Sequence, residues 1–448
     1  MYQVSGFKPF AARVALVVIC VLSGSVYPAF AGDKLAYAPP EAWIKAVALP
    51  KPDARYSGAP GQWLLQNSQL KFFDDGSTTY YNEFAIHIQT PAGLQAAQAF
   101  VVWNPDTDEA TVNKLQIIRG DQVIDVLAKG QTFTVLRREQ NLDRAMLDGY
   151  LTGVLQPEGM QVGDTMVFAS SIKRRDPVLG GNVEAVLPSL SGTPVVQQSV
   201  RATWQPAQDV RWRQSNDLHG KLTRTADAAT FLMERTQVVP NELKYDIPAR
   251  FNQFGLIEFS QFASWQDMSK ILAPSYEKAT ILSANSSLQN EIAKIKAASS
   301  DPKVRAAMAL QLVENQVRYV FLGMNLGGYI PAQAETTWQR RFGDCKGKTA
   351  LLIALLNALG IKAEPALVST GGGDGLDQRL PSFELFDHVI VRAEIDGAVY
   401  WMDGTRFGDK TLDSLPTPPL HWALPIRAEG ASLEALPARP LTMSTECF

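Results

Sequence analysis

A cysteine at the start of a predicted buried helix is the residue of this chain best suited to nucleophilic chemistry. Cys345 precedes the apolar run 349–359, which is typical of a buried helix that ends at Gly360. A thiol in the first turn of a helix faces backbone N–H groups and the positive end of the helix dipole, and both favour the thiolate. Four nearby cations favour it further: Arg340, Arg341, Lys346 and Lys348. The thiolate is the nucleophilic form, so the sequence predicts reactivity at this position.

A histidine and an aspartate further along the chain can complete a catalytic site. Residues 386–391 are typical of a strand, Asp396-Gly397 predicts a hairpin turn, and the returning strand ends at Asp403. His388 and Asp403 therefore fall at the same end of the hairpin. If the Cys345 helix packs against that end, the imidazole takes the thiol proton and the carboxylate fixes the imidazole tautomer. The pattern predicts a Cys345–His388–Asp403 triad, with a structural cysteine and a structural histidine as the alternatives.

These motifs resemble bacterial transglutaminase-like domains of the papain-like thiol fold. The resemblance lies in the G-D-C-K run at 343–346, in Asp387-His388 and in the W-M-D-G-T run at 401–405, and it covers roughly residues 265–428. It implies that Cys345 is the nucleophile, His388 the base and Asp403 the orienting carboxylate. Family members often carry an acidic residue where this chain has Gly347, a position outside the triad.

The first half of the chain resembles the uncharacterised β-rich domain that commonly precedes such domains in secreted bacterial proteins. The resemblance covers residues 60–225 and lies in short motifs at 120–124, 155–159 and 162–164. Proteins with this pairing usually continue into a further C-terminal region.

Periodicity divides the chain in the same way. Short strands with turns at Asp75-Gly76 and Gly120-Asp121 predict an antiparallel β-sandwich-like domain over 32–254. Helical patterns, including an amphipathic segment at 259–271, then predict an α+β domain over 255–428. The proline-spotted stretch 429–448 predicts a loose C-terminal tail.

The first 31 residues have the pattern of a secretory signal peptide. Lys8 and Arg13 form a basic region, residues 14–21 an apolar core, and 29–31 an A-x-A cleavage site. The apolar run is too short to span a membrane. We therefore expect a periplasmic or cell-envelope protein without a stable membrane span after cleavage, and an uncleaved anchor is the alternative.

The remaining cysteines, histidines and charges limit the other chemistry. Export leaves Cys345 and Cys447 in an oxidising compartment, so a disulfide between them is the competing account of Cys345. The chain holds 42 Lys and Arg against 45 Asp and Glu, for a net charge of −3, which gives no sign of nucleic-acid binding. His87, His219 and His421 lack metal-ligand spacing, so no metal site and no cofactor are predicted.

The sequence thus predicts an exported thiol acyl-transfer enzyme that acts on protein or peptide substrates. Cys345 attacks a carboxamide or peptide carbonyl, and His388 protonates the leaving amine as an acyl-thioester forms. The acyl group then passes to water, as in a protease or amidase, or to an amine, as in a transamidase. Both outcomes stay open, because the motifs do not show how well the site excludes water. The alternative is a non-catalytic envelope binding or scaffold protein with an idle transglutaminase-like fold.

Overall fold

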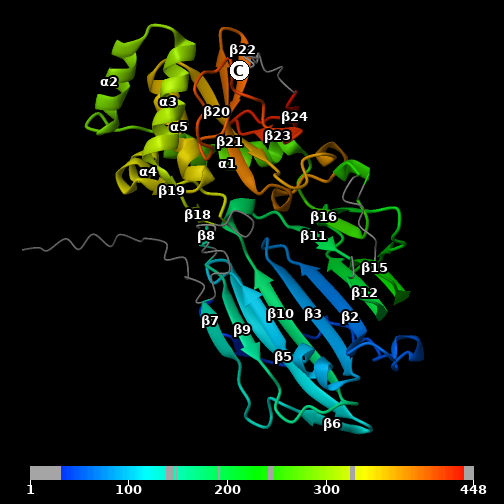
Figure 1. Cartoon of the computed structure of the whole chain (residues 1–448). Coiled ribbons are helices and arrows are strands. Elements are labelled where there is room, and N and C mark those ends of the chain that lie inside the picture. The colour runs from blue at the N-terminus through cyan, green and yellow to red at the C-terminus, as the bar shows by residue number, and fades with distance from the viewer. Residues whose placement is uncertain are drawn as a thin grey trace, which may run out of the picture.

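The computed structural model describes residues 32–137, 146–147, 149–189, 192–240, 247–251, 253–322 and 328–437. The predicted signal peptide and Cys447 lie outside these residues. The described chain has a β-rich N-terminal part and a C-terminal part that combines helices with a five-stranded sheet (Figure 1). The fold is α+β, as predicted. None of the described helices is long and apolar enough to cross a membrane.

The N-terminal part is built on a nine-stranded sheet. Its strands are β1 (Ala36–Tyr37), β2 (Gly61–Phe72), β3 (Thr78–Ile88), β5 (Asp108–Arg119), β6 (Gln122–Asp125), β10 (Thr165–Arg174), β12 (Val195–Trp204), β14 (Lys221–Arg224) and β15 (Ala229–Val238). They are ordered β1-β5-β10-β3-β2-β12-β15-β14, and β6 pairs with β5. The two predicted turns join β2 to β3 and β5 to β6. Most neighbours are antiparallel, whereas β1 with β5 and β2 with β12 are parallel.

Two three-stranded sheets pack on one face of the large sheet. One consists of β4 (Ala99–Trp103), β9 (Leu151–Leu155) and β7 (Thr134–Arg137), and the other of β11 (Glu184–Pro188), β16 (Leu256–Ser260) and β13 (Arg211–Gln214). Alternate residues of β3 point to the same face, so Phe84 packs against the first small sheet and Tyr80 against the second. This arrangement gives the sandwich-like packing. The opposite face carries a smaller apolar cluster that includes Ala85 and contacts Val47.

Strand β16 lies just after the predicted boundary at 254/255 and pairs with β11 and β13 of the preceding part. The helix predicted over 259–271 is therefore wrong in its first residues. Ile257 and Phe259 alternate into the core under β11, and this burial selects a strand there. Helix α1 (Trp265–Ala279) begins only where the Ser264 side chain accepts the N–H of Asp267.

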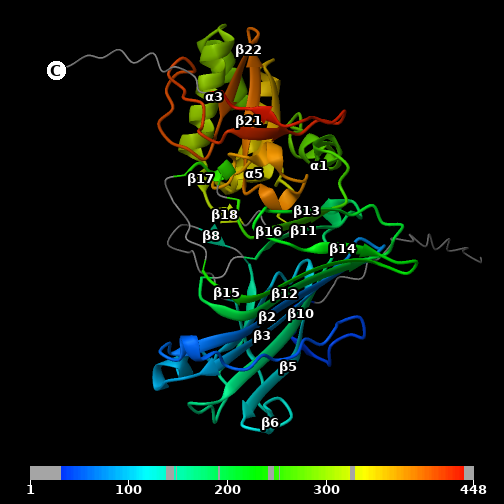
Figure 2. The same cartoon turned by 90° about the vertical axis from the view of Figure 1, so that its right-hand side faces the viewer.

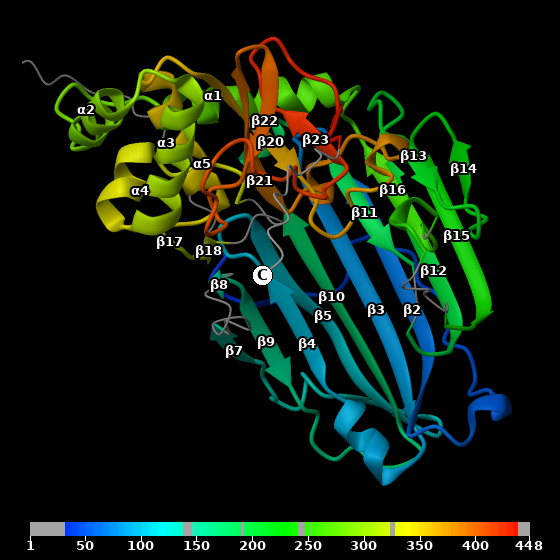
Figure 3. The same cartoon turned by 45° about the horizontal axis from the view of Figure 1, so that its top comes forward.

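The C-terminal part places one buried helix against an antiparallel sheet. The sheet is ordered β22 (Ala398–Met402), β21 (His388–Ile395), β20 (Lys362–Val368), β23 (Trp422–Pro425), β24 (Glu434–Ala435). The other helices are α2 (Leu288–Ala298), α3 (Pro302–Gln316), α4 (Ala334–Arg340) and α5 (Cys345–Ala358). Helix α5 is buried over its first twelve residues, as predicted, and Gly360 follows it with a φ of 80°. Figure 3 shows α2, α3 and α4 gathered beside α5. Strand β24 lies within the stretch predicted as a loose tail, and the part of that stretch beyond residue 437 lies outside the described residues.

The two parts meet where the segment before β21 rests on β11. The backbone N–H of Phe383 donates to Glu184 Oε2 at 2.8 Å, and the N–H of Val186 donates to Glu384 Oε2 at 2.8 Å. Figure 2 shows β11, β13 and β16 between the large sheet and the C-terminal part. The β-rich part therefore holds the chain just ahead of His388.

The carboxyl pair at this contact predicts a stability that falls as the pH rises from 5 to 9. Burial raises the pKa of both carboxyls, and the charge of Glu384 raises that of Glu184 further, while Arg174 opposes the shift of Glu384. The folded chain then holds protons that the unfolded chain releases above the ordinary glutamate pKa of 4.5. The stabilisation from these bound protons is complete below pH 4.5 and is lost as the pH rises through the raised pKa values of the two carboxyls.

The variant Glu184→Gln keeps an acceptor for the Phe383 N–H and removes the charge, so its Tm should fall less across this range. Thermal unfolding followed by circular dichroism at pH 5, 7 and 9 measures the difference. Glu109→Gln, on an exposed position of β5, is the matched control and should behave as the wild type. Parallel curves for the wild type and Glu184→Gln would contradict the assignment.

Candidate active site

Cys345 is the first residue of α5, and Asp344 caps that helix. The Asp344 carboxylate accepts the N–H of Gly347 at 2.9 Å and pairs with the ammonium of Lys346. The preceding short strand β19 (Phe342–Gly343) pairs in parallel with β17 (Arg318–Tyr319) and so fixes where the helix begins. The thiol therefore lies at the helix N-terminus, where the dipole favours its anionic form.

Three of the four cations predicted to favour the thiolate contact other groups, and the fourth, Arg340, is exposed. Lys346 pairs with Asp344, and the buried Lys348 ammonium donates to the Val317 carbonyl at 2.5 Å. Arg340 and Arg341 are exposed at the end of α4, and Arg341 stacks over Trp338 at 3.6 Å. The helix terminus and His388 also favour charge on the sulfur.

His388 and Asp403 meet at one end of the β21–β22 hairpin, as predicted. His388 is the first residue of β21, and Asp403 directly follows β22, which pairs with β21 in antiparallel register. The imidazole Nε2 lies 2.9 Å from Asp403 Oδ2. The other carboxylate oxygen accepts the backbone N–H of Thr405 at 2.9 Å and its hydroxyl at 2.7 Å. Thr405 thus fixes the carboxylate so that one oxygen faces the imidazole.

The imidazole also hydrogen-bonds the thiol of Cys345. Burial disfavours charge on His388, but its hydrogen bonds to Asp403 and to Cys345 outweigh burial and raise its pKa to about 10. Burial likewise opposes charge on Asp403, but the hydrogen bonds from His388 and Thr405 outweigh it and lower the pKa of that carboxyl. The structure therefore brings the three predicted residues together by hydrogen bonds, and the raised pKa of His388 favours an imidazolium between the thiol and the carboxylate.

Apolar and aromatic side chains surround the hydrogen-bonded Cys345, His388 and Asp403. Cys345 is 0% exposed and packs in a cluster with Tyr276, Leu367 and Phe386. Burial, and then the charge of Cys345, raises the pKa values of Tyr276 and of Tyr319. In such low-dielectric surroundings charge pairs interact more strongly than in water.

Sequence reasoning missed a buried polar cluster behind the triad. Burial lowers the pKa of Lys348 to about 8, against the opposing charges of Glu314 and Asp403. Glu314 of α3 accepts the backbone N–H of Asp409 at 3.3 Å, and burial together with the charge of Asp409 raises its pKa. The signal was the position of Lys348, three residues after Cys345, because that spacing puts both on one face of the helix.

Gly347, which departs from the pattern of the resembled domains, lies where α5 contacts α4. A Cβ at this position would lie 2.8 Å from Thr337 Oγ1, which is buried without a hydrogen-bond partner among the described residues. We expect Gly347→Ala to lower the free energy of unfolding by about 1–3 kcal/mol, because overpacking forces the helices apart. Urea unfolding of Gly347→Ala, Thr337→Ala and the double variant measures it. The double variant should recover most of the loss, and a strictly additive result would exclude this contact as the cause.

Comparisons with known proteins bear on both parts of the chain. A sequence family described as a domain of unknown function with a solved structure (DUF3857) matches residues 74–241. No functionally curated protein matches the chain in sequence.

Solved structures extend the likeness to the C-terminal part. The chain superposes on a candidate protease from Parabacteroides distasonis with a TM-score of 0.64 and 15% identity, over 84% of this chain and 72% of that one. Two weaker matches are a TGase, with a TM-score of 0.22 and 16% identity over 48% of this chain and 52% of that one, and the periplasmic domain of TgpA from Pseudomonas aeruginosa, with a TM-score of 0.20 and 14% identity over 65% and 87%. At these identities the first likeness concerns the fold alone. That likeness shows that the fold of this chain, over both its β-rich and its C-terminal part, is shared with the candidate protease.

Proposed function

We propose that this chain, whose transglutaminase-like fold follows a β-rich domain, is an exported enzyme that transfers acyl groups through Cys345. The observation that carries the proposal is the contact chain from Cys345 through His388 to Asp403, with 2.9 Å between imidazole and carboxylate. A thiol at a helix N-terminus, a histidine in hydrogen-bond contact with it and a carboxylate that orients the histidine are the parts that thiol acyl transfer needs.

The reaction starts when Cys345 Sγ attacks the carbonyl carbon of a carboxamide or peptide bond. Backbone N–H groups at the start of α5 face the oxyanion that develops. His388 gives its proton to the leaving nitrogen, the C–N bond breaks, and an acyl-thioester remains on Cys345. Water or an amine then adds to the thioester carbonyl, His388 accepts the proton of that nucleophile, and the thiolate leaves. The products are a carboxylic acid or a new amide.

Export is supported by the signal-peptide pattern at 1–31. The mature chain is expected to begin at Gly32 and to act on protein or peptide substrates of the periplasm or cell envelope. Mass spectrometry of the protein recovered from the periplasmic fraction of expressing cells should give Gly32 as the first residue. Recovery with Met1 in the membrane fraction would instead indicate an uncleaved anchor.

One observation favours the non-catalytic alternative, in which the same fold binds partners in the envelope. Cys345 is completely buried, so a substrate carbonyl reaches the sulfur only if neighbouring side chains move.

Acylation of the protein separates the two functions. Mature protein carrying Cys447→Ser has Cys345 as its sole thiol, and an activated aryl ester such as p-nitrophenyl acetate should add one acyl group to it. Intact-mass and peptide-mass measurements locate the adduct, and added amine should shorten its lifetime if the acyl group passes to amines. Cys345→Ala should form no adduct. Acylation that occurs only after denaturation of the protein would favour the binding protein.

A further inference from the structure

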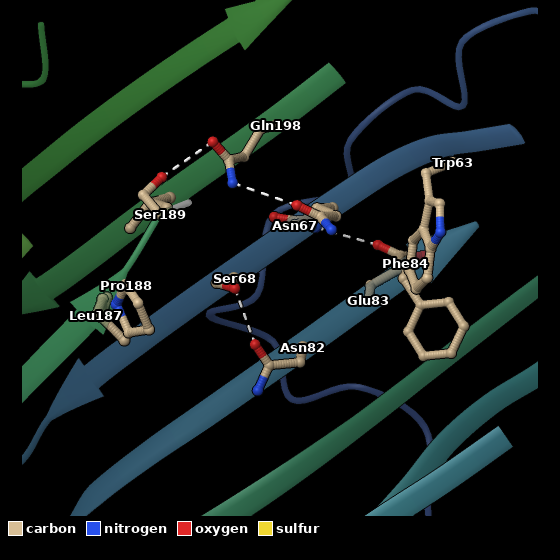
Figure 4. Close-up of a pocket in the computed structure, with 12 residues that line it drawn as sticks. Trp63, Asn67, Ser68, Asn82, Glu83, Phe84, Leu187, Pro188, Ser189 and Gln198 are labelled. Carbon is tan, nitrogen blue, oxygen red and sulfur yellow. Dashed lines mark hydrogen bonds between the residues drawn. The ribbon is translucent and has the colours of Figure 1, made fainter. Parts of the chain in front are cut away.

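A groove on the β-rich part lies far from the triad in the chain and has the make-up of a binding site. It has a volume of about 270 Å³ and lies on the face of the large sheet that carries both small sheets (Figure 4). Strands β2, β3 and β12 form its floor, and the end of β11 with Ser189 forms one wall. The side chains that line it include Gln66, Ser68, Asn82, Phe84 and Gln198.

The floor is polar between the two apolar cores, one of which lies beneath each small sheet. Along β3, Tyr80 belongs to one core and Phe84 packs against the other, and Asn82 between them is exposed. Its cross-strand partner on β2 is Ser68, with Gln66 as the next residue on the same face. Polar side chains at these inward positions serve neither core.

The hydrogen bonds inside the groove leave two side-chain amide nitrogens without an acceptor among the described residues. Arg235 and Ser189 donate to Gln198 Oε1 at 3.1 and 2.9 Å, and Gln198 Nε2 donates to Gln66 Oε1 at 3.3 Å. Ser68 Oγ donates to Asn82 Oδ1 at 2.8 Å (Figure 4). The side-chain carbonyl oxygens of Gln66 and Asn82 thus each accept a hydrogen bond. Within the described residues, the amide nitrogens of these two side chains donate to no group. Two oriented N–H donors on neighbouring strands suit a ligand with acceptor oxygens.

We propose that this groove binds an N-acetylated oligosaccharide. An acetamido carbonyl and ring hydroxyls supply acceptors for Asn82 and Gln66, and the apolar face of a sugar ring suits the aromatic pair Trp63 and Phe84, whose centroids are 5.3 Å apart. The volume suits one such ring rather than a drug-sized molecule, for which pockets measure about 300–1,000 Å³.

An extended peptide suits the groove less well, because peptides bind sheets mainly by main-chain hydrogen bonds at an open edge. The floor strand β2 pairs with β3 on one side and with β12 on the other, so its backbone groups are already used. The Arg235 guanidinium is likewise engaged, with Gln198 and the Ser189 carbonyl, which favours a neutral ligand over an anionic one. The inference is independent of the acyl-transfer proposal, since it uses no residue of the triad.

Calorimetric titration of the full chain with the tetramer of N-acetylglucosamine tests the site. We expect saturable binding, weaker binding of the unacetylated glucose tetramer, and no binding of tetra-alanine. Asn82→Ala and Gln66→Ala should each weaken binding about tenfold through the loss of one hydrogen bond. Asn216→Ala, at an exposed turn outside the groove, makes the same change as a control and should bind as the wild type.

Circular dichroism melts of each variant establish that it is folded before it is titrated. The proposal is overturned by an absence of saturable heat with the acetylated tetramer at millimolar concentration, by unchanged affinity in both groove variants, or by preferential binding of tetra-alanine. Loss of acylation at Cys345 leaves these results unaffected.

Discussion

Replacement of His388 by alanine is expected to slow the alkylation of Cys345 by iodoacetamide about 100-fold at pH 6.5. In the wild type the imidazolium, with a pKa raised to about 10, keeps its charge through this range and stabilises the thiolate that it contacts. Without it, an ordinary thiol with a pKa of about 8.5 is only about 1% thiolate at pH 6.5. The wild-type rate should therefore change little between pH 6.5 and 8.5, whereas the variant rate should rise about 50-fold over the same range.

The measurement uses mature protein carrying Cys447→Ser, with the label located on Cys345 by mass spectrometry. His219→Ala removes an exposed histidine of the β-rich part and should leave the profile unchanged. If the wild-type rate instead rises with pH as steeply as that of His388→Ala, Cys345 is a structural thiol and the binding-protein alternative follows.

Replacement of Asp403 by asparagine is expected to lower kcat for acyl transfer about 10⁴-fold while the fold is kept. The carboxylate Oδ2 accepts from His388 Nε2, which leaves the other ring nitrogen for the thiol. An asparagine amide can donate to Nε2 and so hold the opposite tautomer. In that tautomer the other ring nitrogen already carries a proton and cannot accept the thiol proton of Cys345. The hydrogen bonds from Thr405 to Oδ1 can persist in the variant, so the loss should exceed any change in stability.

Rates with an aryl ester and with a peptide amide measure this loss, and a thermal melt accompanies each. Asp413→Asn makes the same change at an exposed carboxylate and should retain the wild-type rate. Asp403→Asn activity within tenfold of the wild type would show that the carboxylate has no orienting role.

The arrangement of the triad residues could be predicted because each of its parts is set by local sequence. The Asp396-Gly397 turn pairs β21 with β22 and so brings His388 and Asp403 together, whatever the rest of the chain does. The Asp344 cap and the apolar run after Cys345 likewise fix where α5 begins and how deeply it is buried. Only the approach of helix to hairpin needed a long-range assumption.

Features that depend on contacts between distant segments could not be predicted. The parallel pairing of β2 with β12 joins residues more than a hundred positions apart, and no local turn specifies it. The same holds for β16, whose last two residues fell within the predicted helix. An amphipathic pattern over a few residues does not distinguish a strand between two other strands from a helix. The buried partners of Lys348 also come from separate elements, α3 and the segment that follows β22.

The contact between β11 and the segment before His388 has a consequence for any chimeric protein made from the C-terminal part. Glu184 of the β-rich part accepts a backbone N–H of the C-terminal part, and Glu384 of the C-terminal part accepts a backbone N–H of the β-rich part. A gene fusion that joined this C-terminal part to an unrelated domain would keep Cys345, His388 and Asp403. It would lose the two hydrogen bonds that fix the segment just before β21.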